Sequence, residues 1–155
     1  MMTIYYLDAS AIAKRYLLEP GSWWINSLLD QTDEHRFVVV ELGSVETVCA
    51  FTRARRTGRI GAAALARFVA RASIEMKTIL GLLAVSNAVL GYASQLALRY
   101  PLRAYDAVHL ATALELRADS IAADLPAPIF VSADENLLAA ARAEGLSAEN
   151  PNDHP

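Results

Sequence analysis

Short apolar runs alternate with longer amphipathic segments along most of the chain. The apolar runs are rich in β-branched and aromatic residues and predict strands over residues 3–7, 37–40, 78–85 and 129–131. Apolar residues that recur every three or four positions predict helices over residues 9–19, 22–29, 42–56, 62–75, 87–99, 103–117 and 134–144. Because strands and helices alternate, we predict an α/β fold of three layers, in which helices cover both faces of a mostly parallel central sheet.

Two segments do not follow this alternation. Residues 118–128, ADSIAADLPAP, are predicted to form a loop or a short hairpin that looks like an insertion. The last residues, 151–155, are predicted to be a frayed tail. A chain of 155 residues has the usual size of a single domain, so we expect one domain over residues 1–150.

No segment is expected to cross a membrane. The longest apolar stretch, residues 78–85, is much shorter than the roughly 20 residues that a membrane span requires. The first ten residues, MMTIYYLDAS, lack a basic region and reach Asp8 early, which is unlike a signal peptide. We therefore expect a cytoplasmic protein.

Composition and charge narrow the classes of function. Hydrophobic residues make up 54% of the chain and charged residues 20%, which excludes a disordered chain. A net charge of −3 argues against binding nucleic acid through a broad basic surface, but a nuclease remains open because cations bound at an acidic site offset its charge. The lone Cys49 cannot form an intramolecular disulfide and is predicted to be a buried apolar residue on the same helix face as Val45 and Val48.

Acidic residues stand where predicted strands end or predicted helices begin. Asp8 follows the first strand, Asp106 lies near the start of its helix, and Asp134 follows the last strand. In parallel α/β sheets these positions lie at the ligand-binding edge, so the three carboxylates are expected to converge. Glu46 lies one turn into the helix after the second strand and can reach the same edge. Glu41 competes with it for this role, and spacing alone leaves the choice open.

The acidic pattern also has a structural interpretation. An aspartate that opens a helix is more often an N-cap than a ligand, which applies most directly to Asp134. Asp8 is the stronger candidate, because it interrupts an apolar stretch where an unpaired charge is costly. Two unit charges about 6 Å apart cost roughly 3 kcal/mol at an effective dielectric of about 20, so clustered carboxylates need protons or cations. Oxygen ligands without a His or Cys cluster favour Mg²⁺ or Mn²⁺, and such ions support phosphodiester hydrolysis.

Four blocks of the sequence, in this order, resemble the signature segments of PIN-domain proteins, and among these the VapC-type toxins of toxin–antitoxin pairs. The blocks span nearly the whole chain: YLDASAIAKRYLLEPGS, SVETVCAFTRARRTGRI, LRAYDAVHLATALEL and FVSADENLLAAARAEGL. The resemblance implies a PIN-like α/β/α sandwich and an Mg²⁺- or Mn²⁺-dependent endoribonuclease. It also implies an RNA substrate, a cognate antitoxin protein and a homodimer.

The resemblance assigns the site residue by residue. The catalytic and metal-binding positions fall on Asp8, Glu46, Asp106 and Asp134, which favours Glu46 over Glu41. The supporting hydroxyl positions are Ser10 and Ser132, where the family often has Thr.

The sequence gives weaker evidence for a functional role of other side chains near the four acidic residues. The hydroxyls of Ser10 and Ser132 are expected to orient Asp106 by hydrogen bonds. His109 is expected to pack in the core rather than to take part in the chemistry. Four basic residues are candidates for contact with RNA or with the antitoxin, although a solvated helix face explains them equally well: Lys14, Arg15, Arg53 and Arg56.

Two other functions compete with the nuclease. One is a PIN-fold module that binds a partner protein without catalysis, which loss of an acidic residue would have favoured. The other is a phosphatase that uses Asp8 as its nucleophile, and such a site would need a second aspartate where this chain has Ser10. Stabilisation of the folded protein by a divalent metal distinguishes the nuclease from the binding module.

Overall fold

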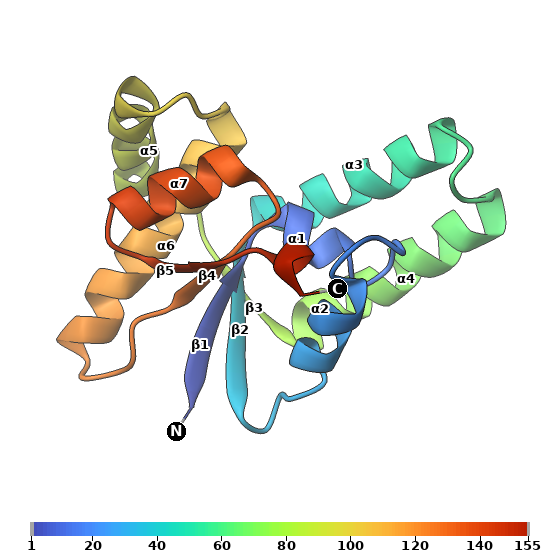
Figure 1. The fold of residues 1–155 in the computed structure, drawn as a ribbon, viewed down its shortest axis with the longest axis horizontal. Coiled ribbons are helices and arrows are strands. Elements are labelled where there is room, and N and C mark those ends of the chain that lie inside the picture. The colour runs from blue at the N-terminus through green and yellow to red at the C-terminus, as the bar shows by residue number, and fades with distance from the viewer. Residues whose placement is uncertain (1, 155) are drawn as a thin grey trace.

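A computed structural model describes residues 2–154 and confirms the predicted α/β architecture (Figure 1). Five strands form one sheet in which every neighbouring pair is parallel, in the order β3-β2-β1-β4-β5. The strands are β1 (Thr3–Leu7), β2 (His35–Val40), β3 (Leu80–Leu83), β4 (Ile129–Val131) and β5 (Ser147–Glu149). Parallel pairing requires crossover connections, and these are the helices that the periodicity predicts.

The helices lie on both sides of the sheet. They are α1 (Ala9–Ala13), α2 (Ser22–Leu29), α3 (Leu42–Arg56), α4 (Ala62–Thr78), α5 (Asn87–Arg99), α6 (Ala104–Ala122) and α7 (Glu135–Ala143). Helices α5, α6 and α7 cover one face, while α1 and α2 cover the other, and α3 and α4 extend away from the sheet as a helical pair (Figure 1). This arrangement gives the three layers of the fold. No helix within residues 2–154 is long and apolar enough to cross a membrane.

Alternation along the strands divides the core into two parts. Tyr6 and Phe130 point to the face under α5, α6 and α7, where they pack in one apolar cluster. The next residues along their strands, Leu7 and Val131, point to the opposite face and join the cluster under α1 and α2. Side chains that alternate in this way lock the register of each strand, because a slip of one residue exchanges the two faces.

The order of the strands creates a binding edge between β1 and β4. The chain proceeds from β1 outward to β2 and β3, and then returns to the other side of β1 to form β4 and β5. In open parallel sheets the crevice for ligands lies beyond the carboxyl ends of the strands, at the point where the strand order reverses. Asp8 follows β1 directly, and Ser132 follows β4 directly, so both lie at this point.

The segment 118–128 differs from its prediction. Helix α6 continues to Ala122 instead of ending near residue 117, and the buried Ser120 secures its last turn. Asp119 and Ser120 are poor helix formers, which favoured a loop, but burial outweighs this local preference. The chain then turns at Asp124, which has a positive φ of 56°, and reaches β4.

The end of the chain is packed rather than frayed. Residues 147–149 form β5, an edge strand that was not predicted, and Pro151–Asp153 form a short 3₁₀ turn with Pro151 buried. The ring of His154 stacks on Trp24 of α2 with a centroid separation of 4.3 Å. The last residue of the predicted tail, Pro155, and Met1 at the start of the predicted domain lie outside the described residues.

Candidate active site

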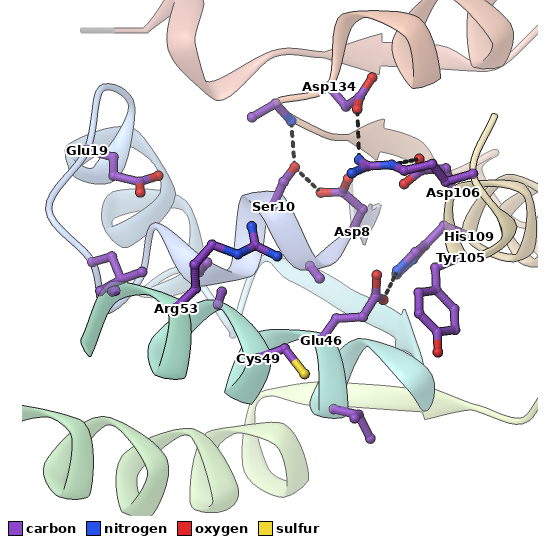
Figure 2. A pocket seen from close by; sticks show the side chains of 18 of the residues that line it. Asp8, Ser10, Glu19, Glu46, Cys49, Arg53, Tyr105, Asp106, His109 and Asp134 are labelled. Atoms are coloured by element: carbon purple, nitrogen blue, oxygen red, sulfur yellow. Dashed lines mark hydrogen bonds and ion pairs between the residues drawn. The ribbon is translucent and has the colours of Figure 1, made fainter. Parts of the chain in front are cut away.

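A cavity of about 870 Å³ opens at the edge where β1 and β4 end, between α1, α3 and α6 (Figure 2). All four carboxylates that the sequence singled out line this cavity: Asp8, Glu46, Asp106 and Asp134. They come from four different elements and are separated by up to 126 positions in the sequence. The fold therefore brings together residues that were selected one by one.

Asp8 lies at the floor of the cavity and is almost completely buried, with 4% of its surface exposed. Its Oδ1 accepts hydrogen bonds from the Ser10 hydroxyl at 2.6 Å and from the Ala11 amide at 2.9 Å, so Asp8 also caps the N-terminus of α1. Burial raises the pKa of the Asp8 carboxyl above its ordinary value, while His109 and the hydrogen bonds lower it. Burial is the largest cause, so the ionised form of Asp8 is destabilised when no cation is near.

The two predicted hydroxyls hold Asp8 and not Asp106, which corrects the expected partner. Ser132 donates to Oδ2 of Asp8 at 2.6 Å, opposite the bond from Ser10. Each hydroxyl also accepts a hydrogen bond from a backbone amide of the turn after β4, Ser10 from Ala133 and Ser132 from Asp134. Because the amides occupy a lone pair of each oxygen, each hydroxyl proton is directed to the carboxylate.

Asp106 and Asp134 both pair with the guanidinium of Arg103, a residue that the sequence reasoning did not identify. The Nε of Arg103 lies 2.9 Å from Oδ2 of Asp106, and its Nη2 lies 3.3 Å from Oδ2 of Asp134 (Figure 2). The Arg103 side chain is 79% exposed, so these ion pairs lie on the solvent side of the cavity. Asp134 also caps α7 by accepting from the Leu137 amide at 3.1 Å, as the N-cap interpretation predicted.

Glu46 has a different partner. Its Oε2 lies 2.6 Å from Nε2 of His109, a ring that is 98% buried between α6 and the sheet. The other ring nitrogen, Nδ1, lies 3.0 Å from the hydroxyl of Tyr6 on β1. Glu41, the competing glutamate, is exposed and does not line the cavity; its carboxylate accepts from the Val85 amide instead. The structure thus places Glu46, and not Glu41, with the other carboxylates.

The face of α3 that carries Val45 and Cys49 lies at the cavity rather than in the core. Val45 and Cys49 line the cavity, and Cys49 is exposed, so the prediction that it is buried was wrong. The core side of α3 consists of Thr47, Phe51 and other residues that are shifted around the helix. Periodicity identified a helix here but not its orientation, because small residues and hydroxyls can also face a core.

The four basic candidates lie in very different places. Lys14 is buried, donates to the Pro20 carbonyl at 2.8 Å and pairs with Glu19. Arg15 pairs with Asp30 at 2.8 Å and with Glu75 at 3.3 Å, so both residues serve internal contacts. Arg56 is exposed but does not line the cavity.

Arg53 alone among these four residues lines the cavity, into which its side chain reaches from α3 (Figure 2). Arg59 also lines it and is paired with Glu19 at 3.0 Å, whereas no ion pair joins Arg53 to another residue of the described chain. Arg53 is therefore available to an anionic ligand.

The donor set suits a hard cation, although the side chains are turned toward protein partners. The four acidic residues supply only carboxylate oxygens to the cavity, the ligand type that Mg²⁺ and Mn²⁺ prefer. Across residues 2–154, no three His, Cys, Asp or Glu side chains form a ready group of metal ligands. Arg103 pairs with Asp106 and Asp134, and His109 holds Glu46 by a hydrogen bond. The chemistry fits a cation once the exposed Arg103 side chain moves aside.

Sequence reasoning missed Arg103, and it assigned His109 to packing, yet one pattern connects both to Asp106. The three residues follow each other at intervals of three on α6, and residues with this spacing share a helix face. A search of the residues three positions before and after Asp106 would therefore have found both neighbours.

Comparisons with solved structures define the class of fold. The sequence matches no protein-family model and no curated protein. Its structure matches VapC20 of Mycobacterium tuberculosis, a toxin that cleaves the sarcin–ricin loop, at 17% identity over 93% of this chain and 96% of that chain, with a TM-score of 0.60. It also matches VapBC2 from Rickettsia felis, solved with a DNA fragment from their promoter, at 14% identity over 96% and 98%, with a TM-score of 0.62.

A third match is a toxin–antitoxin complex from Klebsiella pneumoniae, at 11% identity over 95% of this chain and 97% of that chain, with a TM-score of 0.58. The chain therefore has a PIN-like α/β fold that it shares, over nearly its whole length, with VapC toxins. At such low identity the likeness concerns the fold, and the activity must be argued from the site.

Proposed function

We propose that this protein is a metal-dependent endoribonuclease that hydrolyses phosphodiester bonds of RNA, as the toxin of a type II toxin–antitoxin pair. One observation carries the proposal. Four carboxylates from distant segments line one cavity, and that cavity lies at the edge where parallel sheets bind ligands. The fold is that of VapC toxins, one of which cleaves an RNA loop.

The proposed cofactor is Mg²⁺ or Mn²⁺, held by Asp8, Glu46, Asp106 and Asp134. When bound, such an ion lowers the pKa of a coordinated water and offsets charge on the scissile phosphate. The protein contributes fixed ligands. Two hydroxyls and one amide hold both oxygens of Asp8, which defines the orientation of this carboxylate.

The proposed contact with the RNA backbone is Arg53. Its guanidinium lies in the same cavity as the carboxylates and has no carboxylate partner in the described chain. Arginine binds phosphate through several N–H donors, so it suits a phosphate next to the scissile one. Lys14 and Arg15, which serve internal pairs, and the more distant Arg56 have no proposed contact with the scissile strand.

The proposed protein partner is an antitoxin that covers the cavity mouth. Val45 and Tyr105 line the cavity and are 61% and 57% exposed, so apolar surface borders the acidic residues. A partner segment with apolar side chains and a basic group matches this surface in shape and charge. Complexes of toxins with antitoxins occur among the structures of the same fold. A homodimer is the proposed assembly, and light scattering on the purified protein tests it.

The two competing functions have less support. A module that only binds a partner is favoured by one observation, the pairing of Arg103 with Asp106 and Asp134, which neutralises two of the carboxylates. A phosphatase with Asp8 as nucleophile fits poorly, because both carboxylate oxygens accept hydrogen bonds and the residue is almost fully buried. The nuclease uses all four carboxylates.

The test is cleavage of a mixed pool of structured RNAs by the purified protein, with Mg²⁺, with Mn²⁺ and with EDTA. The wild type is compared with Asp8→Asn and Asp106→Asn, and Glu41→Gln is a matched control outside the cavity. Cleavage that requires metal, disappears in both aspartate variants and persists in the control supports the proposal, provided that the melting temperatures are retained. Equal behaviour of all proteins at every metal condition overturns it.

A further inference from the structure

A buried chain of hydrogen bonds runs from the centre of the sheet to one carboxylate of the cavity. The hydroxyl of Tyr6 lies 3.0 Å from Nδ1 of His109, and Nε2 of the same ring lies 2.6 Å from Oε2 of Glu46. Tyr6 is fully buried and His109 is 2% exposed, whereas Glu46 reaches the cavity. The imidazole thus joins the core to the cavity, and both of its nitrogens have partners.

The chemistry of the carboxylate partner determines which atom donates in the bond to Glu46. An ionised carboxylate only accepts hydrogen bonds, so Nε2 must carry a proton to bond Glu46. The other ring nitrogen, Nδ1, meets the Tyr6 hydroxyl, a group that can both donate and accept a hydrogen bond. Burial raises the pKa of the Tyr6 phenol well above its ordinary value, so Tyr6 keeps its proton and remains a donor. The bond from Nε2 to Glu46 therefore has a defined direction, and Nδ1 has the Tyr6 hydroxyl as its partner.

Packing holds the ring in this orientation. Tyr6 stacks on Phe130 of β4 with an interplanar angle of 10° and meets the His109 ring edge-on at 84°. On the other side, Gly43 in the first turn of α3 approaches His109, and a Cβ at Gly43 would clash with Val39. The missing side chain lets the start of α3 lie close to Val39 of β2, and Glu46, one turn later, comes within reach of Nε2.

We propose that His109 is the positioning residue for Glu46: its Nε2–H, kept in place by the Tyr6 hydroxyl, holds the glutamate carboxylate in the cavity as a metal ligand. This inference rests on the proposed function and adds to it a residue that acts through Glu46. Partners that orient a ligating carboxylate typically contribute about 10- to 100-fold to metal affinity or activity. A histidine that only fills space would contribute to stability but not to metal affinity.

The experiment compares Mn²⁺ binding by calorimetry at one pH for the full chain and four variants. His109→Leu fills the space without a donor, His109→Gln places an amide N–H near the position of Nε2, and Tyr6→Phe removes only the hydroxyl. Ser120→Ala is the control, because Ser120 is a buried polar residue of the same helix that does not line the cavity. Melting temperatures are recorded for all five proteins.

We expect His109→Leu to bind Mn²⁺ about 10- to 100-fold more weakly than the wild type. His109→Gln should recover most of the affinity, Tyr6→Phe should show a smaller loss, and Ser120→Ala should show none. Nitrogen NMR of the histidine rings should find the His109 proton on Nε2, with a signal that shifts in Glu46→Gln. Should His109→Leu not fold, the Tyr6→Phe affinity and the NMR signal decide the question.

Three results overturn the inference: wild-type affinity in His109→Leu, a glutamine variant as weak as the leucine variant, or the ring proton on Nδ1. Failure of the proposed function looks different. If the wild type binds Mn²⁺ and the variants keep the expected order, but no RNA is cleaved, the positioning role stands and the nuclease proposal falls. If the wild type binds no Mn²⁺, both fall together.

Discussion

Replacing Arg103 by Gln should increase the affinity of the cavity for a divalent cation. In the metal-free protein the guanidinium pairs with Asp106 at 2.9 Å and with Asp134 at 3.3 Å. A cation that uses these carboxylates must compete with the guanidinium for their oxygens. Glutamine is shorter and uncharged, so the variant removes the competitor and keeps a polar side chain at the mouth.

The size of the effect follows from the exposure of the pair. Arg103 is 79% exposed, and exposed ion pairs contribute about 0.2 to 1 kcal/mol each. Two such pairs amount to roughly 0.4 to 2 kcal/mol that the wild type gives up when the cation binds. At about 1.4 kcal/mol per factor of ten, the variant should bind Mn²⁺ about 2- to 30-fold more tightly.

Calorimetric titration with Mn²⁺ measures this, and the metal-dependent rise in melting temperature checks it independently, because a ligand of the native state stabilises by RT ln(1 + [L]/Kd). Arg99→Gln is the matched control, since Arg99 pairs with Glu144 at 2.8 Å away from the cavity. That control should lose a little stability without any change in affinity. Unchanged or weaker binding of Mn²⁺ by Arg103→Gln would refute the reasoning.

Three further predictions concern the other residues of the cavity. A carboxyl whose pKa is raised by folding takes up a proton when the protein folds, so in EDTA the protein should lose stability as pH rises from the ordinary carboxyl pKa through the raised pKa of Asp8. Melting curves at several pH values should show this loss in the wild type but not in Asp8→Asn, and an equal slope in both contradicts the assignment. Arg53→Gln should weaken RNA binding in EDTA and lower the slope of log affinity against log salt by about 0.7 to 1, whereas Arg55→Gln, on the same helix but outside the cavity, should leave the slope as it is. Glu46→Gln should reduce RNA cleavage on the order of 100-fold or more, as loss of a charge-stabilising group does, while Glu41→Gln should cleave normally; the opposite ranking would return the role to Glu41.

Local patterns in the sequence were sufficient for the framework. Runs such as residues 3–7 and 37–40 have the composition of buried strands, and the intervening helices have a period of 3.6, so the parallel three-layer fold followed from their alternation. The same patterns placed acidic residues at strand ends, and resemblance to known signature segments selected Glu46 over Glu41. These features are local, because each depends only on residues that are close together in the sequence.

Local patterns failed where contacts with distant residues outweigh them. Helix α6 extends to Ala122 because Ser120 is buried against the rest of the protein, and the end of the chain is ordered because His154 meets Trp24. The face of α3 was ambiguous for the same reason, and Cys49 therefore faces the cavity. Burial decides such cases, and burial depends on what other elements place opposite a residue.

Most partners of the carboxylates come from distant parts of the chain and are set by the tertiary structure. Tyr6 and His109 are 103 positions apart, and Ser132 and Asp8 are 124 apart, so no period of a helix or strand relates them. The sequence determined which residues carry the acidic groups. The fold decided that hydroxyls fix Asp8, that Arg103 neutralises two carboxylates and that an imidazole holds Glu46, because hydrogen bonds and ion pairs depend on distances of about 3 Å that only the packed chain sets.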